Sequence, residues 1–264
     1  MNKIFQIQPY IFKELLRAKL TNIYRTLFDK VVNFYIWAIC TLLISGHLMQ
    51  AFGMAKDYGA FQLGGVVACV GLFELYGNAV TFVSDLEGDK SIVYYLTLPS
   101  SALSVLLSYI CYYALVSASM ALFLLPLAKL ILWNEFSLIN VLWLKLLFFI
   151  VLNNFVYATA TILASALIPS MDKFDKLWNR FVYPLWIFGG FQFSWISVNG
   201  KWPLFSYIML LNPVTYTTEG IRASLIGQEG NISYWICCLA LIMVGIIVSF
   251  WAFKALKKRL DFVE

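Results

Sequence analysis

The chain has 264 residues, of which 61% are hydrophobic, 17% are aromatic and only 12% are charged. Soluble domains carry about 25% charged residues, and a soluble chain of this length could not bury so much apolar surface. The composition therefore predicts an all-α polytopic membrane protein. The net charge of +5 does not indicate nucleic-acid binding, because the basic residues lie between apolar runs and report membrane topology first.

The first 30 residues are basic, and their apolar side chains recur at helical spacing. Apolar positions from Ile11 to Ile23 are interspersed with charged ones such as Lys13 and Arg17. This pattern predicts an amphipathic helix lying on the cytoplasmic membrane surface, and an N-terminal extension of the first span is the alternative. The short apolar core and cleavage site of a signal peptide are missing.

Long runs without charge follow, and they predict six transmembrane helices. A bilayer core of about 30 Å needs about 20 helical residues, and each run is long enough. The predicted spans are near 31–50, 60–83, 102–126, 143–168, 181–198 and 233–253. We expect a single transmembrane domain over 1–264, with spans one to five at 31–198, an outer element at 199–232, and the last span and tail at 233–264.

The distribution of Lys and Arg on alternate sides of these spans predicts the orientation. Fourteen of the 19 Lys and Arg residues lie in the N-terminal segment, the loops after spans two and four, and the C-terminus. The other five are Lys56, Lys129, Lys145, Lys201 and Arg222. By the positive-inside rule, both termini are predicted to be cytoplasmic.

Glu74 is the one charged residue well inside a predicted span. Such a group is costly in lipid and usually faces the bundle interior or water. It could line a pathway or hold a dimer interface, and a structural hydrogen bond is the alternative.

The loop between spans two and three, SDLEGDKSIVYYLTLPSS (84–101), contains a short amphipathic element. Asp85 and Glu87 are solvated, and the apolar positions of 92–98 form one face that ends before Pro99, which lacks a backbone N–H. A compact helix between two spans is suited to docking a soluble partner. A surface-lying turn without a partner is the alternative.

Aromatic residues are concentrated in FVYPLWIFGGFQFSWI (181–196). An interfacial aromatic belt is one explanation. The other is that some rings line a conduit for lipid-linked or sugar substrates. Gly189 and Gly190 predict a break or kink within span five.

The stretch LNPVTYTTEGIRASLIG before the last span has the signals of a short capped helix. Asn212 suits the N-cap and Pro213 the first helical position. About 14 helical residues extend only about 21 Å, too short to cross a bilayer. Glu219 and Arg222 are three positions apart, so they share a helix face and can pair.

Catalytic and cofactor motifs are missing from the sequence. It contains no GxxxxGK[ST] motif for nucleotide binding, no HExxH and no GxSxG, so we predict no catalytic or metal site and no cofactor in this chain. The five cysteines show no metal-binding spacing, and we expect them to be buried hydrophobic side chains.

These features together resemble the membrane subunit of a type-2 ATP-binding cassette (ABC) exporter, over essentially the whole chain. The similarity lies in the amphipathic N-terminal helix, the loop helix ending in YYLTLPSS, six spans with both termini inside, and LNPVTYTTEGIRASLIG. The last is the most specific, because the family typically has an Asn-Pro, an aromatic, an acidic residue and an Arg there. One departure is Asp85-Leu86-Glu87, where the family often has a basic residue.

The resemblance implies roles for both loops. The 85–98 segment would be a coupling helix that sits in a groove of an ATPase subunit, with contacts from Asp85, Glu87, Ile92, Leu96 and Leu98. The 203–227 segment would be a re-entrant gate in the outer leaflet, formed by Asn212, Pro213, Tyr216, Glu219 and Arg222.

The resemblance also implies the function of the chain. It would be the permease of an ABC exporter in the plasma (inner) membrane, moving an amphipathic small molecule or lipid out of the cytoplasm. Two ABC ATPase copies would bind ATP and Mg²⁺, and a second permease copy would complete a homodimer. Export of a lipid-linked surface polysaccharide and a secondary transporter or channel using Glu74 are the alternatives; a membrane enzyme would need a catalytic constellation that the sequence lacks.

Overall fold

The computed structural model describes residues 8–21, 23–97, 101–168 and 170–261, which are almost entirely helical and contain no β-strand. Five helices in this part of the chain are long and apolar enough to cross a membrane. They are α2 (Tyr24–Leu43) continued through η1 (Ile44–Leu48) and α3 (Met49–Ala51), α4 (Tyr58–Glu87), α6 (Ala102–Ile131), α7 (Trp143–Leu167) and α13 (Tyr234–Asp261). The chain is thus a multi-pass helical membrane protein.

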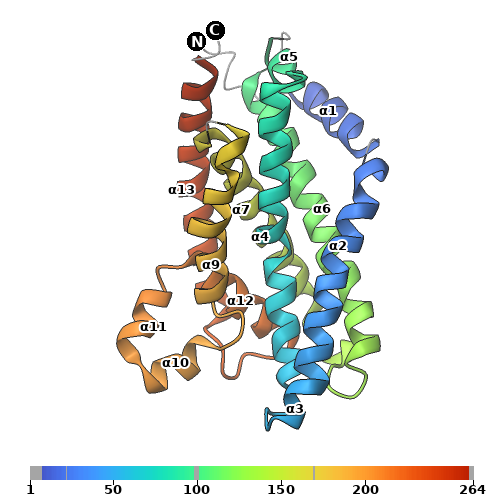
Figure 1. The fold of residues 1–264 in the computed structure, drawn as a ribbon, viewed down its shortest axis with the longest axis vertical. Helices are drawn as coiled ribbons and strands as arrows, with labels where there is room; N and C mark the ends of the chain where they lie inside the picture. Colours follow the sequence, from blue (N-terminus) through green and yellow to red (C-terminus); the bar gives the residue numbers. More distant parts are fainter. Residues whose placement is uncertain (1–7, 22, 98–100, 169, 262–264) are drawn as a thin grey trace.

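The long helices form a bundle in which α7 packs against α4, α6 and α13 (Figure 1). The core is made of apolar side chains on the facing sides of these helices, including Leu63, Leu72, Leu124 and Phe149. The outward side of α13 remains exposed and apolar, as at Ile246 and Phe250, which is the pattern of a helix that faces lipid.

The fifth predicted span differs most from the structure. The helix there begins earlier, at Met171, and ends at Phe188. It consists of η3 (Met171–Lys173), α8 (Phe174–Leu177), the π-helical η4 (Trp178–Val182) and α9 (Tyr183–Phe188). Gly190 then adopts a φ of +75°, which glycine adopts without steric cost. An irregular turn over residues 189–194 therefore interrupts the predicted 181–198 helix.

The third span was predicted to stop at Pro126, but α6 continues to Ile131. A proline inside a helix removes one backbone hydrogen bond. Leu124, Leu125 and Ala128 are fully buried on either side of it, and this packing stabilises the extra turn.

Two further helices lie near the upper end of the bundle in Figure 1, where the last turns of α13 also lie. The predicted N-terminal helix is present as α1 (Pro9–Thr21) and packs against α6. The short helix of the loop between spans two and three is α5 (Ser91–Thr97).

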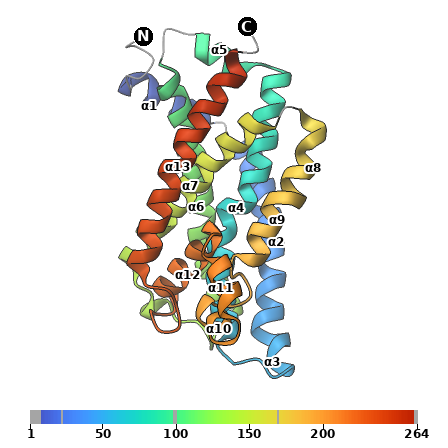
Figure 2. The same cartoon turned by 90° about the vertical axis from the view of Figure 1, so that its left-hand side faces the viewer.

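The outer element lies toward the opposite end and contains three helices (Figures 1 and 2). They are α10 (Trp195–Lys201), α11 (Pro203–Met209) and α12 (Pro213–Leu225). The helix predicted from the capping signals is α12, and it packs against α4, α7 and α13.

Glycine allows α4 to approach this outer element closely. A Cβ added to Gly65 would lie 2.9 Å from the carbonyl oxygen of Phe191, whereas a Cβ on Gly77 of the same helix would meet nothing within 4 Å. The first contact is with backbone, which cannot rotate out of the way.

We therefore predict opposite effects for two Gly→Ala substitutions in α4. Gly65→Ala should destabilise the protein by about 1–3 kcal/mol through overpacking. Gly77→Ala should be neutral or stabilising by up to about 1 kcal/mol, because alanine favours the helix. Thermal unfolding in detergent, followed by tryptophan fluorescence, measures both. A melting temperature unchanged by Gly65→Ala would contradict the close approach.

Candidate functional site

The start of α12 is fixed by the predicted cap. The Asn212 side chain accepts a hydrogen bond from Val214 N at 3.0 Å, and its amide nitrogen donates to the Leu185 carbonyl of α9 at 2.7 Å. Pro213 occupies the first helical position. The Tyr216 hydroxyl donates to the Leu210 carbonyl at 2.9 Å. The cap residue therefore positions both its own helix and the end of α9.

Arg222 of α12 is completely buried, with 0% of its surface exposed. Its Nη1 donates to the Gly190 carbonyl at 2.7 Å and to that of Phe193 at 3.4 Å, and its Nη2 donates to Phe191 O at 2.8 Å. Its Nε donates to the Phe61 carbonyl at 3.1 Å, and the Phe61 ring centroid lies 3.5 Å from Cζ. One guanidinium thus attaches the turn after α9 to α4.

Glu219 lies one helical turn before Arg222 and is equally buried. Its Oε1 accepts from Trp195 N at 2.9 Å, and its Oε2 accepts from Ile232 N at 2.9 Å. Arg222 Nη1 is 3.9 Å from Oε1. The two side chains neutralise each other's charge, but backbone groups make the shorter contacts of both.

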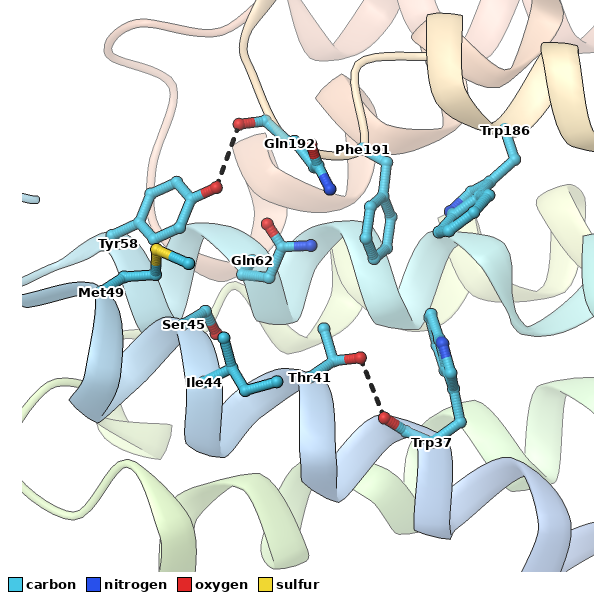
Figure 3. A pocket seen from close by; sticks show the side chains of 10 residues that line it. All are labelled: Trp37, Thr41, Ile44, Ser45, Met49, Tyr58, Gln62, Trp186, Phe191 and Gln192. Carbon is cyan, nitrogen blue, oxygen red and sulfur yellow. Dashed lines mark hydrogen bonds between the residues drawn. The ribbon is translucent and has the colours of Figure 1, made fainter. Parts of the chain in front are cut away.

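A cavity of about 220 Å³ lies beside this turn, between α2, α4, α9 and residues 191–192 (Figure 3). It is lined by Trp37, Thr41, Ile44, Ser45, Met49, Tyr58, Gln62, Trp186, Phe191 and Gln192. We call it the aromatic cavity. Trp37 and Trp186 both lie beside Phe191, with centroids 5.8 and 5.1 Å from its ring, so part of the 181–196 aromatic cluster faces inward.

Two polar atoms of the aromatic cavity are buried and without a hydrogen-bond partner among the described residues. They are the Oε1 of Gln62, an acceptor, and the Nε1 of Trp186, a donor. Buried polar groups are normally paired, so both atoms are available to a molecule in the cavity. Gln62 was not predicted as a site residue from the sequence, although an amide inside a predicted span was a signal.

Other aromatic side chains of the cluster point outward. Phe181, Tyr183 and Phe188 are exposed, as expected for rings at a lipid surface. The cluster therefore contains both inward-facing and outward-facing rings.

Glu74 pairs with a basic residue of α2. Lys30 Nζ donates to Glu74 Oε2 at 2.7 Å and to Asn78 Oδ1 at 2.6 Å. This ion pair balances the charge of Glu74 and holds α2 against α4.

The predicted coupling segment contains two residues that hold it in place. Asp85 Oδ2 accepts from Ile92 N at 2.8 Å, and Oδ1 accepts from Ser91 N at 3.3 Å, so Asp85 caps α5. Ile92 is only 1% exposed and packs in a cluster with Phe82 and Tyr113. Ile92 therefore faces the chain's own core, whereas Asp85 is half-buried beside the start of α5.

The exposed surface at this end comes from neighbouring positions. Glu87 is exposed at the end of α4, and Tyr94 of α5 has 62% of its surface exposed. Leu96 belongs to α5, but its side chain and all of Leu98 lie outside the described part of the structure.

Helix α1 lies close to the same segment. Lys19 Nζ is 3.0 Å from the centroid of the Tyr109 ring in α6. Burial lowers the pKa of Lys19 to about 7, and nearby Asp85 acts in the opposite direction. The N-terminal helix and the α4–α5 turn therefore influence each other electrostatically.

The structure thus defines a multi-pass membrane protein with a capped helix buried at one end and a short helix anchored at the other. Among the described residues, no group of three or more His, Cys, Asp or Glu side chains is placed to hold a metal ion. The sequence profile of the ABC-2 type transporter family matches residues 10–226. The chain therefore belongs to that family and is a permease subunit of a type-2 ABC transporter, which implies an ABC ATPase partner. A comparison with curated proteins gave no match.

The contacts of Glu219 and Arg222 predict the result of exchanging them. If the two side chains formed only a simple ion pair, the double exchange would restore part of what each alanine substitution loses. The structure predicts no recovery, because the carboxylate accepts from two N–H groups and the guanidinium donates to carbonyls. Each alanine variant should lose about 3–5 kcal/mol, as expected when one partner of a buried pair is removed. Size-exclusion chromatography after heating measures the folded fraction, and recovery in the exchange variant would contradict the backbone contacts.

Proposed function

We propose that the chain is the permease of an exporter that moves an amphipathic small molecule or lipid out of the cytoplasm. This proposal rests on one observation, that α4 makes contacts with functional regions at both of its ends. Its last turn holds α5 through Asp85, and its first turns contribute Phe61 to the Arg222 contacts and Gln62 to the aromatic cavity. One helix of 30 residues, about 45 Å long, thus joins a docking surface to a binding cavity.

In this proposal the partner ATPase, which binds ATP and Mg²⁺, contacts the exposed face of α5 and the neighbouring Glu87. When the ATPase moves, α4 shifts relative to α2 and α9 and changes the aromatic cavity. Substrate leaves past the turn that Arg222 holds, so the 203–227 region acts as the gate.

The proposed assembly has two permease copies and two ATPase subunits in the plasma (inner) membrane. The charge distribution supports an orientation with both termini in the cytoplasm, because 14 of the 19 Lys and Arg lie on that side of the predicted topology. In this orientation α5 faces the ATPase and α12 lies near the outer leaflet.

An amphipathic substrate is supported by the lining of the aromatic cavity, which combines ring faces with one free acceptor and one free donor. The same rings favour the second candidate, a lipid-linked surface polysaccharide, since sugars pack against aromatic faces. The ion pair with Lys30 argues against a secondary transporter or channel that uses Glu74, because a proton-carrying carboxylate must exchange its proton during each cycle.

Co-purification tests both the association with an ABC ATPase and the docking site on α5. The tagged chain, purified in mild detergent from its own cell, should bring an ABC ATPase with it. Tyr94→Asp and Leu96→Asp should each weaken this association by about tenfold or more, as for a contact worth 1.4 kcal/mol or more.

Ile92→Asp serves as the contrasting variant. Since Ile92 is buried in the chain's own core, the charge should cost about 3 kcal/mol or more and reduce the folded fraction. Size-exclusion chromatography separates this outcome from lost docking. If no ATPase accompanies the wild-type chain, or if both α5 variants keep it at the wild-type level, the proposed coupling is overturned.

A further inference from the structure

A second cavity, of about 500 Å³, lies between α4, α7 and the helical stretch from η3 to α9. It is lined by Leu72, Leu75, Ala160, Leu163, Ala164, Leu167, Ile168, Lys173, Lys176, Leu177, Arg180, Phe181, Val182 and Leu185. None of these residues lines the aromatic cavity. We call it the basic-rimmed cavity. Helix α8 lies toward the upper end of the bundle, the end that also carries α5 (Figure 2).

The walls of the basic-rimmed cavity are apolar, and part of its depth comes from small side chains. Ala160 and Ala164 of α7 face it from one side and Leu72 of α4 from another. Its volume falls within the range of about 300–1,000 Å³ that is typical of small-molecule sites. Two lining residues, Leu167 and Phe181, are 66% and 61% exposed, so the cavity opens sideways on the surface of the bundle, where lipid chains lie.

Three cationic side chains line one part of this cavity. Lys173, Lys176 and Arg180 are spaced by three and four residues, so they share one side of the helical stretch. Within the described residues, none of the three forms a salt bridge with an Asp or Glu side chain. Asp172 and Asp175 belong to the same stretch but do not line the cavity.

A neighbouring arginine, by contrast, has hydrogen-bond partners on the backbone. Arg259 of α13 donates to the carbonyls of Ser165 and Ile168 at the end of α7, the second bond being 2.7 Å. It therefore completes the end of a helix. The three cations of the cavity have no comparable partner among the described residues.

We propose that the basic-rimmed cavity binds one anionic phospholipid, with an acyl chain between α4 and α7 and the phosphate at Lys173, Lys176 and Arg180. Arginine and lysine bind phosphate through charge-assisted hydrogen bonds, and basic pockets between transmembrane helices recognise anionic headgroups. A zwitterionic lipid carries a cation that the three side chains repel. A neutral amphiphile has no negative group to pair with the three cationic side chains.

The test is native mass spectrometry of the purified chain in detergent with equimolar phosphatidylglycerol and phosphatidylcholine. The wild-type chain should retain one phosphatidylglycerol in preference to phosphatidylcholine by at least about fivefold. The variant with Lys173→Gln, Lys176→Gln and Arg180→Gln should lose this preference. All three residues are exposed, so the substitutions leave the core intact.

A charge-matched control removes three cations from the same end of the bundle. Lys254, Lys257 and Lys258 of α13 are exposed and do not line the cavity, so changing all three to Gln should leave the preference as in the wild type. Ala160→Phe, which narrows the cavity, should lower the retention of phosphatidylglycerol.

Four results would overturn the proposal. They are equal retention of both lipids by the wild-type chain, an unchanged preference in the cavity variant, an equal loss in the control variant, and a permease dimer that carries no lipid because the second copy covers the cavity. The measurement needs no ATPase, so its failure would leave the proposed export function standing, and failed ATPase co-purification would leave the lipid site standing.

Discussion

The guanidinium of Arg222 is the contact on which the outer half of the molecule depends. The turn after α9 leaves the carbonyls of residues 190, 191 and 193 without helical partners, and a membrane protein has little water inside to satisfy them. Arg222 donates to all three and to Phe61 of α4. Its charge is tolerated because Glu219 lies 3.9 Å away, and Glu219 accepts from the backbone at the starts of α10 and α13. Two side chains thus define the course of the chain from α9 to α13.

Helix α4 extends the effect of this contact to the other end of the bundle. Its glycines allow the turn and α12 to approach, since a Cβ on Gly64 would lie 2.5 Å from Arg222 Cγ. Farther along, Glu74 and Asn78 hold Lys30 of α2, and Asp85 caps α5. These contacts all lie on one continuous helix, which reaches from α5 to the aromatic cavity.

The sequence predicts those features that depend on local rules. The long apolar runs give five of the predicted spans, and the Asn212–Pro213 signals place α12 to within a residue of its start. The break in span five could be anticipated at Gly189–Gly190, but not its extent. The turn is held by Arg222, about 30 positions away, and Arg222 also donates to Phe61, which is 161 positions from it. Likewise, the amphipathic pattern of α5 does not reveal which residues face the bundle; contact with Phe82 and Tyr113 buries Ile92.

The short helix α9, like α4, lines both cavities. Leu185 lines the basic-rimmed cavity, whereas the next residue, Trp186, lines the aromatic cavity. Helix α9 has only six residues and lies between the π-helical η4 and the glycine turn, and π-helical segments often mark functional sites. It is also held by the bond from Asn212 to the Leu185 carbonyl, in the middle of the helix. Because consecutive residues of α9 line different cavities, the position of this helix shapes both, and the cap of α12 is one of the contacts that hold it in place.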